Sequence, residues 1–268
     1  MSIHLPAMKI LRFQDEFGAR YGVLEGSDIF ALEGSPFDGI TVGPRVGHLG
    51  EVRLLAPCVP SKIIAVGLNY RVPEREGEDV RPDEPILFLK PPSAVIATDR
   101  PIVWPCVSQR IDFEGEVAIV IGKTARKISP AEAHAYLLGV TCANDVTARD
   151  LQRREGQWAR AKGFDTFCPL GPWIATDLDI ASCRLITRVN QEVRQSASTS
   201  QLHFSVPELV SYISHVMTLL PGDVILTGTP PGWGPLRIHD VVEVEIEGVG
   251  TLRNTVVPDE GPARAAGR

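Results

Sequence analysis

The chain has 268 residues, a hydrophobic content of 44%, a charged content of 22% and a net charge of −6. The length is enough for one large or two small globular domains, and the negative charge argues against nucleic-acid binding and against a basic membrane-binding patch. No apolar run approaches the ~20 residues of a membrane span, and the N-terminus lacks the pattern of a signal peptide. We therefore expect a cytoplasmic protein with neither nucleic acid nor membrane as a partner.

The N-terminal region alternates short apolar runs with turns. Residues 8–33 contain three such runs, which predict a small antiparallel β meander. A proline-containing stretch follows, and we place a domain boundary there, with a small β domain over 1–57 and a larger domain over 58–257. Residues 71–85 are rich in Arg, Glu, Asp and Pro, a composition that indicates a surface loop or lid.

The most informative segment is 111–122, in which acidic residues precede a buried strand. Asp112, Glu114 and Glu116 occupy alternate positions, so a strand would direct all three carboxylates to one face. Crowded carboxylates repel one another, and a hard divalent cation such as Mg²⁺, Mn²⁺ or Ca²⁺ would remove that cost. The alternative is an exposed strand start with solvated acids.

Two helices are predicted from their start signals. Ser129 precedes a proline and lies three residues before a glutamate, and this helix should end at Gly139. Ser205 opens the same pattern, and the apolar stripe that follows extends through Met217 to Leu220, before a Pro-Gly pair. Met217 is expected to belong to the core.

Strands are predicted after both helices, over 140–145 and 224–229, and each ends in polar residues. The runs 241–247 and 251–257 flank a glycine-containing turn and predict a hairpin. The tail over 258–268 is rich in Ala, Gly, Arg and Pro and is expected to be disordered. Strands outnumber helices, so the predicted fold class is α+β, mainly β.

Several common sites are excluded by the sequence. The five cysteines are scattered and form no Cys-x-x-Cys pair, so we expect buried free thiols rather than disulfides or a zinc site. The six histidines are isolated and show no ligand spacing. No dinucleotide-binding glycine motif, phosphate-binding loop, nucleophile elbow or His-Glu-x-x-His motif is present.

A set of motifs in one order resembles a known family. It comprises Val-Gly-Leu-Asn-Tyr (66–70), Phe-Leu-Lys-Pro-Pro (88–92), Asp-Phe-Glu-Gly-Glu (112–116), Asn-Asp-Val-Thr-Ala-Arg-Asp-Leu-Gln (144–152), Ala-Lys-Gly-Phe-Asp (161–165) and Leu-Thr-Gly-Thr-Pro (226–230). From about residue 60 to 257 the chain resembles the fumarylacetoacetate hydrolase family. The resemblance implies a mixed β-roll core that follows a small N-terminal β domain, a homodimer and a small-molecule substrate.

The resemblance also implies site residues. The metal ligands carry over to Glu114, Glu116 and Asp145, with Asp112 beside them and Mg²⁺ as the expected ion. The catalytic lysine carries over to Lys162, whereas Gln152 and Thr229 match residues that contact substrate, and Lys90 is a further candidate for substrate contact. The alternative for Lys162 is an exposed loop lysine, and that for Gln152 is a solvated helix position. The alternative for Thr229 is a residue that forms a turn before Pro230.

One departure from the family pattern bears on the reaction. Hydrolytic members carry a His–Glu pair that activates water, and here Pro73 stands at the histidine position while Glu76 remains. Proline has no side-chain proton acceptor, and losing a general base costs roughly 10²–10⁴-fold in rate. Hydrolysis would then need Glu76 or Glu74 to act as the base.

The sequence therefore leaves three hypotheses for the function, of which two are reactions. The first is Mg²⁺-dependent isomerisation or decarboxylation of a small 2-oxo or 2-hydroxy-dienoate diacid through an enolate, which needs no activated water. The second is hydrolysis of a C–C bond, as in acylpyruvate or fumarylacetoacetate hydrolases, with a lid glutamate as base. The third is a catalytically silent relative that binds a metal or ligand.

Overall fold

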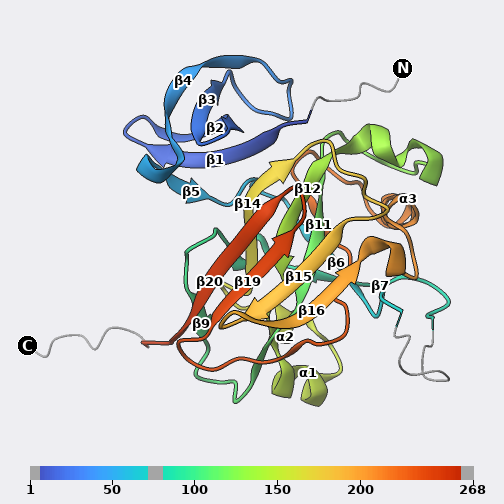
Figure 1. The fold of residues 1–268 in the computed structure, drawn as a ribbon. Coiled ribbons are helices and arrows are strands. Elements are labelled where there is room, and N and C mark those ends of the chain that lie inside the picture. Colours follow the sequence, from blue (N-terminus) through green and yellow to red (C-terminus); the bar gives the residue numbers. More distant parts are fainter. Residues whose placement is uncertain (1–6, 72–80, 261–268) are drawn as a thin grey trace, which may run out of the picture.

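The computed structural model describes residues 7–71 and 81–260, and strands predominate in both ranges (Figure 1). These residues form a twelve-stranded mixed sheet, a five-stranded sheet and a three-stranded sheet. The predicted α+β, mainly β fold class is confirmed. None of the helices in these ranges has both the length and the apolar character needed to span a bilayer.

The largest sheet joins the N-terminal strands to the strands that carry the acidic residues. Its strand order is β4 (Val42–His48), β3 (Asp28–Leu32), β2 (Gly18–Glu25), β1 (Lys9–Asp15), β14 (Cys168–Ala175), β12 (Leu137–Asn144), β11 (Gly115–Ile121), β17 (Val224–Leu226), β6 (Ile63–Gly67) and β7 (Ile86–Lys90). Off this path, β5 (Arg53–Leu55) pairs with β1, and β8 (Val95–Ile96) pairs with β14.

The two smaller sheets and the helices complete the described chain. The five-stranded sheet has the order β16 (Glu192–Ser198), β15 (Arg184–Val189), β19 (Val241–Ile246), β20 (Gly250–Pro258) and β9 (Ile102–Trp104). The three-stranded sheet has the order β13 (Thr147–Ala148), β10 (Ile111–Phe113) and β18 (Gly234–Pro235). The helices are α1 (Arg149–Glu155), α2 (Ala159–Lys162), α3 (Val206–Val216) and the 3-10 helices η1 (Leu49–Glu51), η2 (Pro92–Ala94), η3 (Pro130–Tyr136) and η4 (Thr199–Gln201).

Strand β11 lies at the centre of the core, which explains its continuous apolar sequence. All seven of its residues are buried, as expected for a strand that is covered on both faces. Val117 and Ile119 pack with β19 residues such as Val244, in the core between the two large sheets. Ala118 and Val120 belong to a second core on the opposite face. The acidic residues therefore precede a strand that burial holds firmly in place.

The N-terminal meander forms as predicted, and it is continuous with the main sheet. Strands β1, β2 and β3 pair antiparallel in sequence order. Strand β1 also pairs antiparallel with β14, with Lys9 opposite Ala175 and Ile10 opposite Ile174. In Figure 1 these strands lie at the end of the molecule opposite α1 and α2.

The helix predicted from Ser129 to Gly139 is wrong in type and length. The segment forms only the 3-10 helix η3, and Gly139 lies within strand β12. A Cβ atom at Gly139 would lie 2.2 Å from the carbonyl oxygen of Ala175 on the neighbouring strand β14. The glycine therefore permits the close approach of two strands instead of ending a helix.

Helix α3 begins where its cap predicts and ends earlier than expected. The backbone N–H and the hydroxyl of Ser205 donate to Glu208 Oε2 over 2.7 Å and 2.6 Å. The helix stops at Val216, so Met217 and Leu220 lie beyond it. Met217 still packs against the core, whereas Leu220 is exposed.

Of the remaining predictions, the C-terminal hairpin is confirmed, because β19 and β20 pair antiparallel across residues 247–249. All five cysteines are free, and Cys106 differs from the other four in being exposed. Residues 72–80, which make up much of the expected lid, and residues 261–268, most of the expected disordered tail, lie outside the described residues.

Candidate active site and metal centre

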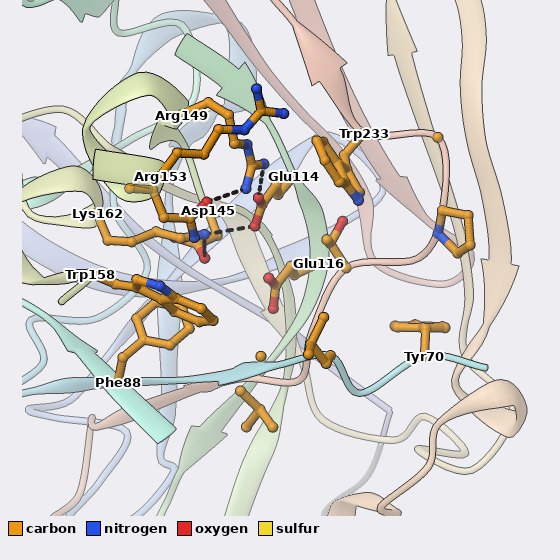
Figure 2. A pocket seen from close by; sticks show the side chains of 17 residues that line it. Tyr70, Phe88, Glu114, Glu116, Asp145, Arg149, Arg153, Trp158, Lys162 and Trp233 are labelled. Atoms are coloured by element: carbon orange, nitrogen blue, oxygen red, sulfur yellow. Dashed lines mark hydrogen bonds and ion pairs between the residues drawn. The ribbon is translucent and has the colours of Figure 1, made fainter. Parts of the chain in front are cut away.

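A cavity of about 590 Å³ opens beside the ends of the central strands. The predicted site residues that line it are Glu114, Glu116, Asp145, Gln152, Lys162 and Thr229. Figure 2 shows the acidic and basic side chains of this group turned toward one another. Residues from segments that are far apart in the sequence therefore meet at one cavity.

Strand pairing brings the three acids together. Gly115 on β11 pairs with Asn144 on β12, so Glu114 and Asp145 face each other just beyond the pair. The Asp145 N–H donates to the Glu114 carbonyl over 2.8 Å. Glu116 lies two residues further along, on the same face as Glu114. Ligand atoms of all three carboxylates lie within 4.8 Å of one another, and all three residues are buried.

The electrostatics of this cluster fit a bound cation. Burial raises the pKa of Glu116 well above its usual value, and the charges of Asp145 and Glu114 raise it further. The Gly228 N–H donates to Glu116 Oε2 over 2.6 Å, and no ion pair to Glu116 occurs among the described residues. Three oxygen ligands that repel one another are a suitable donor set for a hard divalent ion. The residues present therefore fit the expected metal.

Lys162 contacts two of the predicted metal ligands. Its Nζ donates to Glu114 Oε2 over 2.7 Å and also to Asp145 Oδ2. Burial alone lowers the pKa of Lys162, but the charges of Asp145 and Glu114 outweigh burial, and the pKa is raised.

Lys90 has a different position from the one expected of a substrate-binding residue. Its side chain is fully buried and is not among the residues that line the cavity. Its Nζ lies 2.6 Å from Asp145 Oδ1 and donates to the Lys162 carbonyl over 2.5 Å. Lys90 therefore forms a buried ion pair with Asp145 outside the cavity lining, and this position does not favour contact with substrate.

Arg149, which the sequence reasoning missed, contacts several parts of the site. Its Nε donates to Asp112 Oδ2 over 2.8 Å, its Nη2 donates to Glu114, and its Nη1 donates to Gln152 Oε1 over 2.6 Å. The guanidinium also lies 4.1 Å from the ring centroid of Trp233. The available signal was its spacing, three residues before Gln152, which places both side chains on one face of α1.

Asp112 and Thr229 have their side chains engaged by protein groups. Asp112 accepts from Arg110 and Arg149 and is not one of the three clustered acids. The Thr229 hydroxyl donates to the Gly115 carbonyl over 2.9 Å and accepts from Gln195 Nε2 over 2.8 Å. Gln195 was also missed, because nothing near it in the sequence indicates its long-range partners.

Aromatic side chains form much of the apolar wall. Phe88 and Trp158 pack edge to face with ring centroids 5.1 Å apart, and Lys162 Nζ lies 5.1 Å from the Phe88 ring centroid. Trp233 and Tyr70 line other parts of the cavity (Figure 2). The predicted base Glu76, together with Pro73 and Glu74, lies outside the described residues, so its role stays a prediction.

Comparison with known families gives matches over nearly the whole described chain. Residues 62–257 match the family model of the fumarylacetoacetate hydrolase C-terminal domain. Residues 8–57 match the model of the Rv2993c-like N-terminal domain.

Similar proteins carry several catalytic names. The solved structure of a 2-hydroxyhepta-2,4-diene-1,7-dioate isomerase from Mycobacterium marinum is 44% identical with a TM-score of 0.88, covering 95% of this chain and 100% of that one. A fumarylacetoacetate hydrolase from Exiguobacterium antarcticum is 38% identical with a TM-score of 0.85, covering 94% and 100%. The mitochondrial oxaloacetate tautomerase FAHD2A of Bos taurus is 44% identical over 220 residues, covering 77% of this chain and 70% of the relative.

Proposed function

Because the chain belongs to the fumarylacetoacetate hydrolase family, we propose that it is a divalent-metal-dependent isomerase or decarboxylase. Its substrate would be a small 2-oxo or 2-hydroxy-dienoate diacid, and the reaction would pass through an enolate. The observation that supports this proposal is the cluster of three buried carboxylates beside Lys162, all facing one cavity. Relatives that are named as an isomerase and a tautomerase support the same class of chemistry.

The expected cation is Mg²⁺, held by Glu114, Glu116 and Asp145, and Mn²⁺ or Ca²⁺ could use the same oxygen ligands. When bound, it would supply positive charge that stabilises the negative oxygen of an enolate. A cation would share Glu114 and Asp145 with Lys162, which contacts both residues.

The chain's own residues would then bind substrate and move a proton. Lys162 Nζ is the candidate proton donor or acceptor, because it reaches the cavity beside the acids. Gln152 lines the cavity and is oriented by Arg149, so it is suited to hold a substrate carboxylate together with Thr229. Phe88 and Trp158 form an apolar wall on one side of the cavity, which would limit the access of water to the reacting groups.

The second candidate function is hydrolysis of a C–C bond, supported by the similarity to the Exiguobacterium antarcticum hydrolase. In that reaction Glu76 would activate water. Pro73 at the position of the family's histidine favours the first candidate, because neither isomerisation nor decarboxylation needs an activated water. We further propose that the protein forms a homodimer, which a molar-mass measurement in solution would test.

Product identification by mass spectrometry tests these candidates. The purified chain is incubated with oxaloacetate, an acylpyruvate and a hydroxy-dienoate diacid, each with Mg²⁺ and with EDTA. Isomers of unchanged mass or Mg²⁺-dependent loss of CO₂ would support enolate chemistry. Addition of water with cleavage into two acids would refute the first candidate in favour of hydrolysis. No turnover of any substrate, despite a Mg²⁺-dependent thermal shift, would favour a silent relative.

A further inference from the structure

The basic side chains that line the cavity differ in whether they have an acidic partner. Arg149 contacts Glu114, and Lys162 contacts Glu114 and Asp145, so both of these cations already have acidic partners. Arg153 also lines the cavity, and it has no acidic partner among the residues the structure describes. One positive charge therefore faces the cavity without compensation from the described protein.

Arg153 is exposed, and it differs from two neighbouring arginines, which have an acidic partner. Arg154 Nη2 lies 3.4 Å from Glu155 Oε1, and Arg160 Nε donates to Glu155 Oε2 over 3.0 Å. Glu155 therefore forms ion pairs with both of these arginines. A guanidinium without such a partner, beside an aromatic wall, is suited to bind a carboxylate through two parallel hydrogen bonds.

Helix geometry places Arg153 one turn away from Arg149 on α1. Arg149 and Arg153 are four residues apart on α1, so they lie on one helix face about 6 Å apart along the axis. Figure 2 shows Arg153 close to Arg149, on the side of the cavity away from Tyr70. A carboxylate at Arg153 would therefore lie one helical turn beyond the level at which Arg149 holds Glu114 and Gln152.

We propose that Arg153 binds the far carboxylate of the diacid substrate and so determines the preference for diacids over monoacids. This inference rests on the proposed function, in which the other end of the substrate reacts beside Lys162.

The test compares two six-carbon probes that differ only at the far end, 2-oxoadipate and 2-oxohexanoate. Enolate formation is measured with Mg²⁺ as deuterium incorporation at C3 by NMR, and binding is measured separately by thermal shift. In Arg153→Gln, the ratio of kcat/KM for the diacid to that for the monoacid should fall about 10- to 100-fold, through the KM of the diacid. Arg154→Gln, which alters an adjacent paired arginine, should keep the wild-type ratio.

The outcomes separate this inference from the proposed function. An unchanged ratio in Arg153→Gln, or an equal loss for both probes, would overturn the role of Arg153 even if the wild type turns over both compounds. If the wild type exchanges neither probe, the proposed enolate chemistry fails, and the thermal shift then decides on Arg153. In that case, loss of the 2-oxoadipate shift in Arg153→Gln but not in Arg154→Gln would support the far-carboxylate site, and retention of the shift would refute it.

Discussion

Replacing Lys90 with methionine tests how the buried charges of the site are balanced. Lys90 Nζ lies 2.6 Å from Asp145 Oδ1, and both side chains are fully buried. At an effective dielectric constant of ~20, two unit charges 2.6 Å apart attract with about 6 kcal/mol, which the desolvation of both groups partly offsets. Removing one partner of a buried pair typically costs about 3–5 kcal/mol, because the remaining charge loses compensation, and among the described residues Asp145 would keep only its ion pair with Lys162.

This cost should be visible in thermal unfolding without metal. For a chain of this size each kcal/mol lowers the melting temperature by roughly 2–4 °C, so Lys90→Met should melt roughly 6–20 °C below the wild type in EDTA. Mg²⁺ would bring positive charge back to Asp145. The Mg²⁺-dependent rise in melting temperature should therefore be larger in Lys90→Met than in the wild type.

A second lysine provides the matched control. Lys62 pairs with the buried Asp223, away from the cavity, and Asp223 also accepts from Ser61 Oγ over 2.6 Å and from the Leu220 N–H over 2.7 Å. Lys62→Met should destabilise less and leave the Mg²⁺ increment unchanged. If Lys90→Met melts with the wild type in EDTA, or shows the wild-type Mg²⁺ increment, the reasoning about Asp145 is refuted.

Three further predictions concern the metal cluster, a helix cap and a strand contact. Glu116→Gln should abolish the Mg²⁺-dependent thermal shift, and a preserved shift would remove this residue from the metal site. Ser205→Ala should cost about 1 kcal/mol in chemical unfolding at neutral pH. The pKa of Glu208 is lowered by its bonds from Ser205, so this contribution is present above the unfolded value of 4.5 and lost as the pH falls through the folded value, where the variant and the wild type should converge. Gly139→Ala should lower the melting temperature sharply, because its Cβ would lie 2.2 Å from the Ala175 carbonyl oxygen, and wild-type melting would show that the strands can separate there.

The sequence alone predicted the elements whose structure depends on residues close together in the chain. The meander and the C-terminal hairpin follow from alternation and turn residues, which act within a few positions. The cap at Ser205 set the start of α3 in the same way. Gly139 misled the prediction because its role depends on Ala175, 36 positions away in the chain (175 − 139). The end of α3 likewise depends on the pairing of Leu219 with Ala125.

The site shows the same division. The alternating acids of 112–116 pointed to a metal cluster, and Glu114 and Glu116 do meet Asp145. Alternation alone could not show that Asp112 contacts Arg149 and stays outside the metal cluster. Its position depends on the break between β10 and β11 and on Arg149, which belongs to helix α1. Lys90 and Gln195 contact Asp145 and Thr229, which are distant in the sequence, so their roles become visible only once the sheets are assembled.

The pairing of β1 with β14 covers backbone groups that would otherwise be exposed at the edge of β14. The outer edge of β14 is covered by β1 at Ile174 and Ala175 and by β8 at Cys168 and Pro169. A chain that lacked residues 1–57 would leave the first of these stretches with unpaired backbone groups, a template on which strands of other copies could add. We therefore expect the N-terminal meander to protect this edge of the main sheet from aggregation.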